Sequence, residues 1–424
     1  MRKWVAVLLV AVVSVGILSF SITSSLASTK NELEIFSWWT GGGEEEGLNA
    51  LIKLFHEQYP NVKVINATVA GGAGTNAKAV LKTRMLGGNP PDSFQVHAGM
   101  ELIDTYVIPG MMRPITKYMK EWGAYDKFPK AILDMCSYKG NVYSVPVNVH
   151  RGNVVFYNKK IAAEIGMAKP PKTWKEFIRY LKLAKKHGYI GLALGDKNKW
   201  TALHLFEDIM LGKLGPKNYD GLWKNKVSFN NPAIKAALET MKEVLSYINT
   251  DHSAMTWQDA TRLVFSGKAL ANVMGDWAEG YLKTLGWTPG KQFGWFAVPE
   301  TSNAFMVVSD TFGLPKKAPH PKNALRWLKL LASVKAQDVF NPIKGSIPAR
   351  LDADKSKYDV YLRWSMHDFA TVTLCPSIIH GSAAPEGFVT QLNDVINRFV
   401  TKKDVAQAMK GILQDAEDNG YLTK

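Results

Sequence analysis

The sequence predicts an α/β protein built from two lobes, and three observations support this prediction. The chain has 424 residues, which is too long for one compact core and fits two domains of ordinary size. Helical and strand patterns alternate through its first part, as in a largely parallel sheet. Two long extended stretches, residues 143–160 and 294–319, carry no helical pattern and are expected to cross between the lobes.

The first lobe is expected to begin with a strand, a helix and a second strand. The text LEIFSWW, residues 33–39, is the strand pattern, and an amphipathic helix follows it and ends near Pro60. A further helix at 76–88 is closed by two glycines and precedes the strand DSFQVH at 92–97. Ligands of such sheets bind at the carboxyl ends of the strands. The side chains at those ends are Trp38, Trp39, Gln95 and His97.

The second lobe is expected to begin with a proline-started amphipathic helix at 169–188 and to contain the helical stretch 230–248. Segments 321–333 and 335–350 would return to the first lobe, and the C-terminal helices would complete the second. The predicted bounds are 28–147 and 303–350 for lobe 1, 150–299 and 352–424 for lobe 2, and hinges near 148–152, 300–302 and 350–352.

Residues 1–27 have the pattern of a secretory signal peptide. Arg2 and Lys3 precede an apolar run that ends at Phe20, and small residues at 25 and 27 predict cleavage after Ala27. A retained membrane anchor is the alternative, but the apolar run is short for a spanning helix. With no cysteine near the cleavage site, a lipoprotein anchor is not indicated. The mature chain is therefore expected to be soluble and periplasmic or extracellular.

Charge and cysteine content narrow the possible partners. The net charge is +15, which raises nucleic acid as a partner, but the lysines are dispersed over predicted helices and no RNA-type aromatic motif is present. We therefore expect a solvated basic surface and no nucleic acid. Cys136 and Cys375 fit one bridge in an oxidising compartment, and the sequence leaves their pairing open. No Cys/His spacing typical of a metal site is present, so no metal or cofactor is expected.

Short motifs follow one another along the chain, from KLFHEQYPNVKV and NPPDSFQVHAG through YSVPVNVHRGNVVFYNK and PPKTWKEF to FSGKALANVMGDW and VSDTFGLPK. In this order they resemble the extracellular sugar-binding receptors of bacterial ABC importers. The resemblance covers essentially the whole mature chain. It is most similar to the glucose/galactose-binding members, through FSWW, AVLKTRMLGG, FQVHAGMEL, SVPVNVHR, NVMGDWA and NPIKGSI. It implies a periplasmic-binding-protein-like fold, in which two hinge-linked α/β lobes close on a monosaccharide. It also implies a monomer that delivers the sugar to a membrane-embedded ABC permease, without covalent chemistry.

A pyranose needs hydrogen-bonding partners for its hydroxyls and an aromatic ring against its apolar C–H face. Trp38 and Trp39 would supply such walls, and because neighbours in a strand point to opposite sides, at least one is expected to face the cleft. Glu44 or Glu45 would accept from hydroxyls, although a run of three acids that includes Glu46 is also favoured at a helix start by the helix dipole.

The resemblance assigns further ligand contacts in both lobes. Gln95 and His97 lie two residues apart and so share one face of a strand. Trp200 is a secondary candidate, because its surroundings depart from the subgroup by extra residues. The other contacts that the resemblance implies are Trp257, Trp277, the preceding Asp276 (as a contact or as a residue that caps or positions Trp277), Asp310, Lys344 and His380.

Two other functional classes are compatible with parts of this pattern. A glycoside hydrolase also uses tryptophan platforms and paired carboxylates, for which Glu45 and Asp310 are available. Nothing in the sequence indicates one raised and one lowered pKa, which favours a receptor. A polyamine receptor would have an acid-rich site, whereas basic and neutral residues are mixed with few acids here. Within the receptor class, the choice of sugar and epimer, or a disaccharide admitted by a longer loop at 41–46, stays open.

Overall fold

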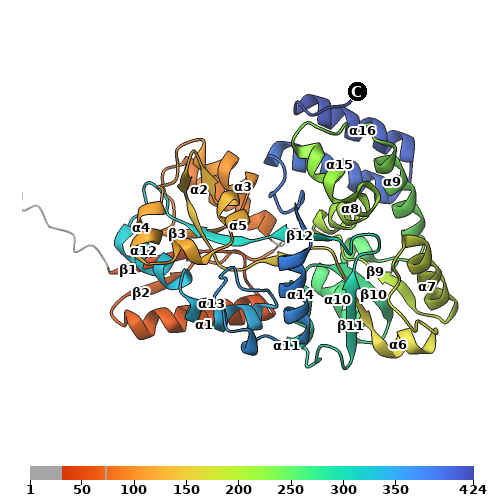
Figure 1. Ribbon diagram of the computed structural model, residues 1–424, viewed down its shortest axis with the longest axis horizontal. Coiled ribbons are helices and arrows are strands. Elements are labelled where there is room, and N and C mark those ends of the chain that lie inside the picture. Colours follow the sequence, from red (N-terminus) through yellow and green to blue (C-terminus); the bar gives the residue numbers. More distant parts are fainter. Residues whose placement is uncertain (1–30, 72–73) are drawn as a thin grey trace, which may run out of the picture.

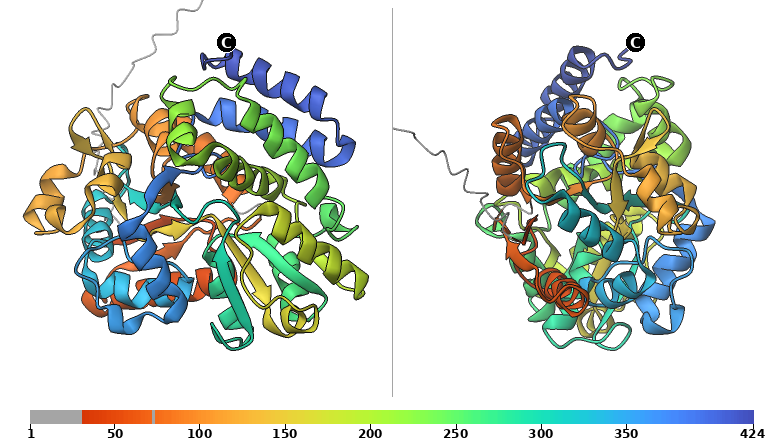
Figure 2. Two further views of the ribbon diagram at one scale, coloured as in Figure 1. Left: turned by 45° about the vertical axis from the view of Figure 1, so that its right-hand side comes forward. Right: turned by 90° about the vertical axis from the view of Figure 1, so that its left-hand side faces the viewer.

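The computed structural model describes residues 31–71 and 74–424, and it has the expected mixed α/β architecture with two lobes. Figures 1 and 2 show the lobes side by side, each with a sheet covered by helices. The expected signal peptide, with its cleavage after Ala27, lies outside the described residues. In the part that is described, no helix has the length and apolar character needed to cross a membrane.

The first lobe contains a five-stranded sheet in the order β2-β1-β3-β13-β6. Strands β1, β2 and β3 are parallel, as the strand–helix alternation predicts, whereas β13 runs antiparallel to both β3 and β6. Its strands are β1 (Glu32–Phe36), β2 (Lys63–Asn66), β3 (Ser93–His97), β6 (Ser144–Pro146) and β13 (Asp310–Gly313). The helices of this part are α1 (Gly43–Gln58), α2 (Thr75–Leu86), α3 (Met100–Leu102), α4 (Thr116–Glu121), α5 (Lys130–Met135), α12 (Pro321–Leu331) and α13 (Val334–Lys344), and β4 (Ser137–Tyr138) pairs with β5 (Asn141–Val142).

The second lobe contains a four-stranded sheet in the order β11-β8-β10-β9. Its strands are β8 (Val154–Asn158), β9 (Ile190–Ala193), β10 (Ala269–Met274) and β11 (Phe293–Ala297). Its helices are α6 (Lys159–Glu164), α7 (Trp174–Lys186), α8 (Trp200–Trp223), α9 (Pro232–Val244), α10 (Trp257–Phe265) and α11 (Trp277–Thr284), with the C-terminal α14 (Val360–Thr371), α15 (Glu386–Lys402) and α16 (Val405–Asp418). Helix α15 packs on α8, and α16 packs on α9.

A third, three-stranded sheet contains parts of both extended stretches. Strand β12 (Ala304–Val308) lies between β7 (His150–Arg151), which is antiparallel to it, and β14 (Thr373–Pro376), which is parallel. Figure 1 shows β12 running between the lobes. Only Ser309 separates β12 from β13, so one extended segment takes part in this small sheet and in the sheet of the first lobe. The lobe and hinge bounds given above stay a prediction.

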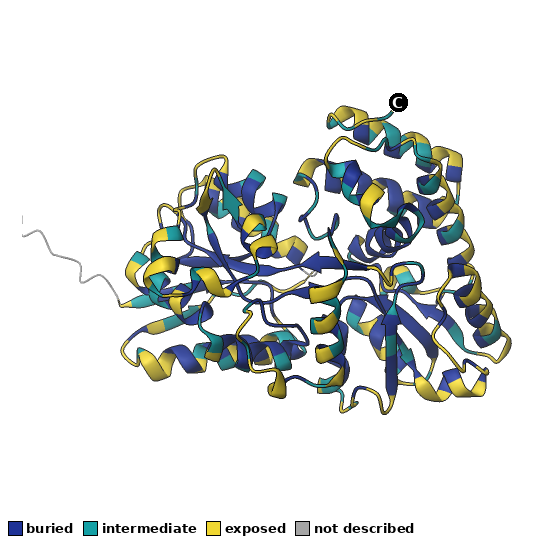
Figure 3. Cartoon of the chain, viewed as in Figure 1, coloured by how far each residue is buried: buried dark blue, intermediate teal, exposed yellow. Residues whose placement is uncertain are grey.

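Residues are buried in the expected pattern. In Figure 3 the strands inside the lobes are coloured as buried, and the outer faces of the helices are coloured as exposed. Trp39 is 1% exposed and packs against Phe312 and Phe340, with ring centroids 5.7 and 4.9 Å away. Cys136 and Cys375 are both buried free thiols, so the bridge that the sequence left open is not formed in this structure.

Candidate functional site

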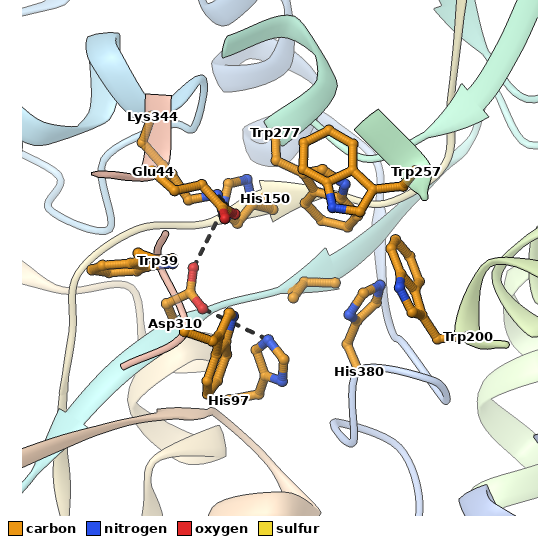
Figure 4. Close-up of a pocket in the computed structure, with 12 residues that line it drawn as sticks. Trp39, Glu44, His97, His150, Trp200, Trp257, Trp277, Asp310, Lys344 and His380 are labelled. Atoms are coloured by element: carbon orange, nitrogen blue, oxygen red, sulfur yellow. Dashed lines mark hydrogen bonds and ion pairs between the residues drawn. The ribbon is translucent and has the colours of Figure 1, made fainter. Parts of the chain in front are cut away.

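A pocket with about 380 Å³ of empty space lies where side chains from both lobes converge. Figure 4 shows these side chains pointing toward one another from helix starts, strand ends and loops. In Figure 4, Lys344, Glu44 and Asp310 lie together on one side of the pocket, and Trp200, Trp257 and Trp277 gather with His380 on the other. The lining residues are Trp38, Trp39, Glu44, His97, His150, Trp200, Trp257, Trp277, Val308, Asp310, Lys344 and His380.

Three of the tryptophans in this lining are positioned by the starts of helices. Trp200, Trp257 and Trp277 are each the first residue of a helix, namely α8, α10 and α11. The start of α10 is fixed by a capping box between Thr256 and Asp259. In front of α11, a Cβ atom added to Gly275 would lie 2.4 Å from the Trp277 ring. Glycine at that position is therefore required for the ring to lie back over the chain.

Asp310 is the anionic centre of the pocket. Its two carboxylate oxygens accept hydrogen bonds from Gln95 Nε2 at 2.7 Å and from Asn148 Nδ2 at 2.8 Å. His150 Nε2 lies 3.3 Å from the carboxylate and His97 Nε2 lies 3.6 Å from it. Burial alone would raise the pKa of Asp310, but the hydrogen bond with His150 and the nearby charges hold it well below its usual range. Asp310 is therefore ionised near neutral pH.

Glu44 and Lys344 form a second charged group, and Gly43 lets them come together. A Cβ atom on Gly43 would lie 2.3 Å from the Ile343 carbonyl oxygen, so α1 can approach the end of α13 only without a side chain there. Lys344 Nζ then lies 3.0 Å from Glu44 Oε1, with the lysine side chain 2% exposed and the glutamate 17%. Burial raises the pKa of Glu44, and Lys344 offsets part of this rise.

His97 of β3 and His150 of β7 differ in their electrostatic surroundings. His97 Nδ1 lies 2.9 Å from Glu101 Oε2, which also accepts from Lys78 Nζ at 2.6 Å. Burial would raise the pKa of Glu101, but Lys78 and His97 lower it to about 2. Burial, followed by the charge of Lys344, lowers the pKa of His150 to about 4, so His150 is neutral near pH 7.

His380 completes the aromatic side of the pocket. Its ring centroid lies 5.1 Å from that of Trp277, 5.5 Å from that of Trp200 and 5.5 Å from that of His97. Burial lowers the pKa of His380 well below its usual value, so the ring is neutral. Within the described chain, no hydrogen-bond partner is present for His380 Nε2, His150 Nδ1 or Trp39 Nε1. Of these, His150 Nδ1 and Trp39 Nε1 are available to a polar ligand.

The pocket brings together nine of the twelve residues that the sequence predicted. Glu45 is exposed on α1 and does not line it. Gln95 lies behind the lining, where it accepts from the Trp38 backbone N–H and donates to Asp310. Asp276 also lies behind it, accepting from the Tyr361 hydroxyl at 2.6 Å.

Sequence reasoning left two lining residues, Val308 and His150, out of its prediction and named a third, Trp200, only as a secondary candidate. Val308 is an apolar strand residue with no signal in the sequence. His150 stands in SVPVNVHR, a motif that was assigned to the hinge, although the motif itself was part of the resemblance. Trp200 was only a secondary candidate, because the text around it departs from the subgroup.

Two α/β lobes with a polar and aromatic pocket between them define a solute receptor. In agreement, residues 41–338 match the family model of the bacterial extracellular solute-binding proteins, and the chain belongs to this family. This membership classes the chain with binding proteins rather than with enzymes.

Several relatives and solved structures are similar to the chain. An uncharacterized ABC transporter extracellular-binding protein of Pyrococcus horikoshii is 41% identical over 96% of this chain and 93% of its own length. A protein of Mesorhizobium japonicum described as a probable sugar-binding periplasmic protein is 32% identical over 90% of this chain and 92% of its own. The solved structure of the solute receptor AcbH, whose title gives a preference for β-D-galactopyranose, has a TM-score of 0.80 at 19% identity and covers 92% of this chain and 98% of its own.

Proposed function

We propose that the chain is an extracytoplasmic receptor that binds a monosaccharide, glucose or galactose, in the pocket between its lobes. It would deliver this sugar to the permease of an ABC importer. The observation that carries the proposal is the lining itself, in which tryptophans from both lobes surround a buried, ionised Asp310 and the Glu44–Lys344 pair. Relatives named as sugar-binding, xylose/arabinose-binding and glucose-binding proteins support the class of ligand.

The chemistry of the lining fits a neutral polyol. The carboxylates accept hydrogen bonds from hydroxyl groups, Lys344 donates one, and the tryptophan faces pack on the C–H surfaces of the ring. A charge-assisted hydrogen bond contributes roughly 1.5–3 kcal/mol. A dissociation constant near 1 μM requires only about 8 kcal/mol, so three or four such bonds with aromatic packing are sufficient after ordering costs.

A disaccharide is the second candidate, and a neighbouring cavity favours it. This open cavity has about 1410 Å³ of empty space and shares His97, Trp200 and His380 with the pocket. It extends between α2 of the first lobe and α15 of the second, with Lys82 and Asn393 among its polar lining residues. A second sugar unit would enter this cavity.

The test is a thermal-shift and calorimetric comparison of glucose, galactose, mannose, xylose and maltose, with a polyamine as control. The protein is unfolded and refolded first, which removes any sugar retained from purification. A rise in melting temperature with glucose or galactose is expected, because the sugar binds only the folded chain. A rise with maltose alone would transfer the proposal to disaccharides, and no rise with any sugar would refute it.

Trp277→Ala provides the matching test of the site. The variant should lose at least about 1 kcal/mol of sugar binding, because aromatic contacts contribute about that much beyond their buried area. Trp122→Ala is the matched control, since Trp122 stacks on Tyr118 away from the pocket. An unchanged sugar affinity of Trp277→Ala would exclude this ring from the binding site.

A further inference from the structure

A cluster of buried metal-ligand-type side chains lies beside Trp277 and His380. His204 and Glu207 are one helical turn apart on α8, and His380 lies in the turn that follows β14. One nitrogen or oxygen of each lies within 4.8 Å of those of the other two. Among the residues that the structure describes, this is the group of three such side chains with that geometry. The His204 ring lies 5.6 Å from His380 and 5.9 Å from Trp277, centroid to centroid.

Several polar atoms of this cluster lack a well-formed hydrogen bond. The His204 side chain is 1% exposed, and neither ring nitrogen makes a hydrogen bond of full geometry within the described chain, although the Gly152 backbone interacts with the ring. Within the same residues, no hydrogen-bond partner is present for His380 Nε2 or for either carboxyl oxygen of Asp208, which follows Glu207 and is fully buried. Buried polar groups are almost always hydrogen-bonded to protein or to ordered water, so several unpaired ones at one place leave room for water or an ion to bind there.

The spacing of the ligand atoms suits one ion. His204 Nδ1 lies 3.7 Å from Glu207 Oε1. Two atoms that each bind Zn²⁺ at about 2.0–2.2 Å are separated by up to roughly 4 Å, so an ion fits between these two without a shift of α8. The other nitrogen of the ring, His204 Nε2, lies 3.7 Å from Asp208 Oδ2. Outer carboxylates commonly fix a ligating histidine ring by accepting a hydrogen bond from its second nitrogen, and Asp208 would do so after closing the present 3.7 Å gap.

Glu207 keeps coordination capacity while it holds the turn that carries His380. Its Oε2 accepts from the backbone N–H groups of Ile378 and Ile379, and its Oε1 accepts from the Ser377 hydroxyl. Each carboxylate oxygen has two lone pairs, so Oε1 retains one for a metal. The ion pairs of Glu207 and Asp208 in the described chain are those with His204, so no lysine or arginine side chain neutralises these buried acids by direct contact.

We propose that His204, Glu207 and His380 bind one divalent transition-metal ion, with Zn²⁺ as the best fit. Two imidazoles and a carboxylate are ligands that Zn²⁺ accepts readily, and a water molecule would complete four-coordination. Asp208 acts as the positioning residue for His204. The ion would fix the His380 ring where it lines the pocket, so that metal and polar ligand bind with positive coupling.

The test uses the purified chain without an affinity tag, stripped with EDTA and titrated with Zn²⁺ and Co²⁺. We expect one Zn²⁺ per chain by elemental analysis after dialysis, and intense visible absorption from four-coordinate Co²⁺. His204→Ala should abolish both signals, whereas Asp208→Asn should weaken Zn²⁺ binding by about 10- to 100-fold, as loss of an outer partner does. His252→Ala is the matched control, because His252 pairs with Asp196 and is not part of the cluster.

Two outcomes would overturn the proposal. The first is less than stoichiometric Zn²⁺ on the wild-type chain, and the second is full retention of Zn²⁺ in His204→Ala, which would place the ion at an adventitious surface site. Circular dichroism is used to check that His204→Ala folds. His380 lines the pocket, and His380→Ala serves as a second variant that lacks one of the metal ligands. These readouts measure metal directly, so they are independent of whether the polar ligand is a sugar.

Discussion

Asp276 makes the stability of this protein depend on pH, and Asp276→Asn is expected to remove that dependence. The side chain is fully buried beside the start of α11, where it accepts from the hydroxyls of Tyr361 at 2.6 Å and Ser365 at 3.4 Å. Burial, as the largest cause, raises the pKa of Asp276 to about 7, even though the Tyr361 hydrogen bond and the charge of Arg151 oppose it. Asparagine preserves the shape and the acceptor for Tyr361 but does not titrate.

The sign and the size of this pH effect on the free energy of unfolding follow from the linkage between protonation and folding. Because the folded chain holds this proton more tightly than the unfolded chain, whose pKa is near 3.8, the stabilising contribution is complete below pH 3.8 and is lost as pH rises to about 7. One pKa unit corresponds to about 1.36 kcal/mol, so the wild-type chain should lose roughly 2–3 kcal/mol of folding free energy through this group between pH 5 and pH 7.5. Asp276→Asn loses none of it.

The assay is thermal unfolding of both proteins at pH 5 and pH 7.5 in the same salt. With an unfolding entropy of about 2.1 cal/mol/K per residue, the melting temperature of Asp276→Asn should gain roughly 3 °C on the wild type across this interval. The comparison cancels the titration of every other group that the two chains share. If the melting temperatures of the two proteins differed by the same amount at both pH values, the raised pKa of Asp276 would be refuted. If the variant gained on the wild type at pH 5 instead of at pH 7.5, the direction of the pKa shift would be refuted.

Two further predictions concern charged pairs. Glu44→Gln should weaken sugar binding by about 10-fold, because a charge-assisted hydrogen bond is lost and the buried Lys344 loses its partner. Glu45 is exposed, so Glu45→Gln should bind sugar as the wild type does, and equal dissociation constants of the two variants in calorimetry would contradict the assignment of Glu44 to the site. Lys82→Ala breaks an ion pair of 2.7 Å with Glu386 between α2 and α15, whose side chains are about half exposed. It should change the free energy of unfolding by less than about 1 kcal/mol, with a smaller effect at high salt, and a larger loss in chemical denaturation would contradict a screened surface pair.

The tryptophan pair that follows β1 shows how far the sequence alone leads. The sequence pattern placed Trp38 and Trp39 in a strand, where neighbouring residues point to opposite sides, but β1 ends at Phe36 and both tryptophans lie beyond it. In the structure Trp39 is packed between phenylalanines, whereas Trp38 lies 5.0 Å from the His97 ring, and both contribute to the pocket. A residue can therefore belong to a core and line a site at once, which alternation alone does not reveal.

Which acid would face the pocket depended on packing between helices that are far apart in the sequence. The run of acids forms the first turn of α1, as the helix dipole favours. The rotation of that turn is set by Gly43 and Gly47, whose missing side chains let α1 lie against α13 at Ile343 and Phe340. This rotation brings Glu44 to Lys344 and leaves Glu45 in solvent. Local sequence contains no information on that contact, because its two sides are about three hundred residues apart.

Helix α8 was not predicted from the sequence, and the physical reason also applies to its residue His204. A helix is recognised from its sequence by an apolar stripe with a polar face opposite, and this requires one side to meet water. The first half of α8 is buried on every side, from Trp200 to Leu211, so polar and apolar residues do not alternate at the helical period. His204, Glu207 and Asp208 are consequently absent from the site residues that the sequence predicted. These side chains stand out as a candidate site only because they are buried with polar atoms that lack hydrogen-bond partners. Burial is a property of the fold rather than of the local sequence.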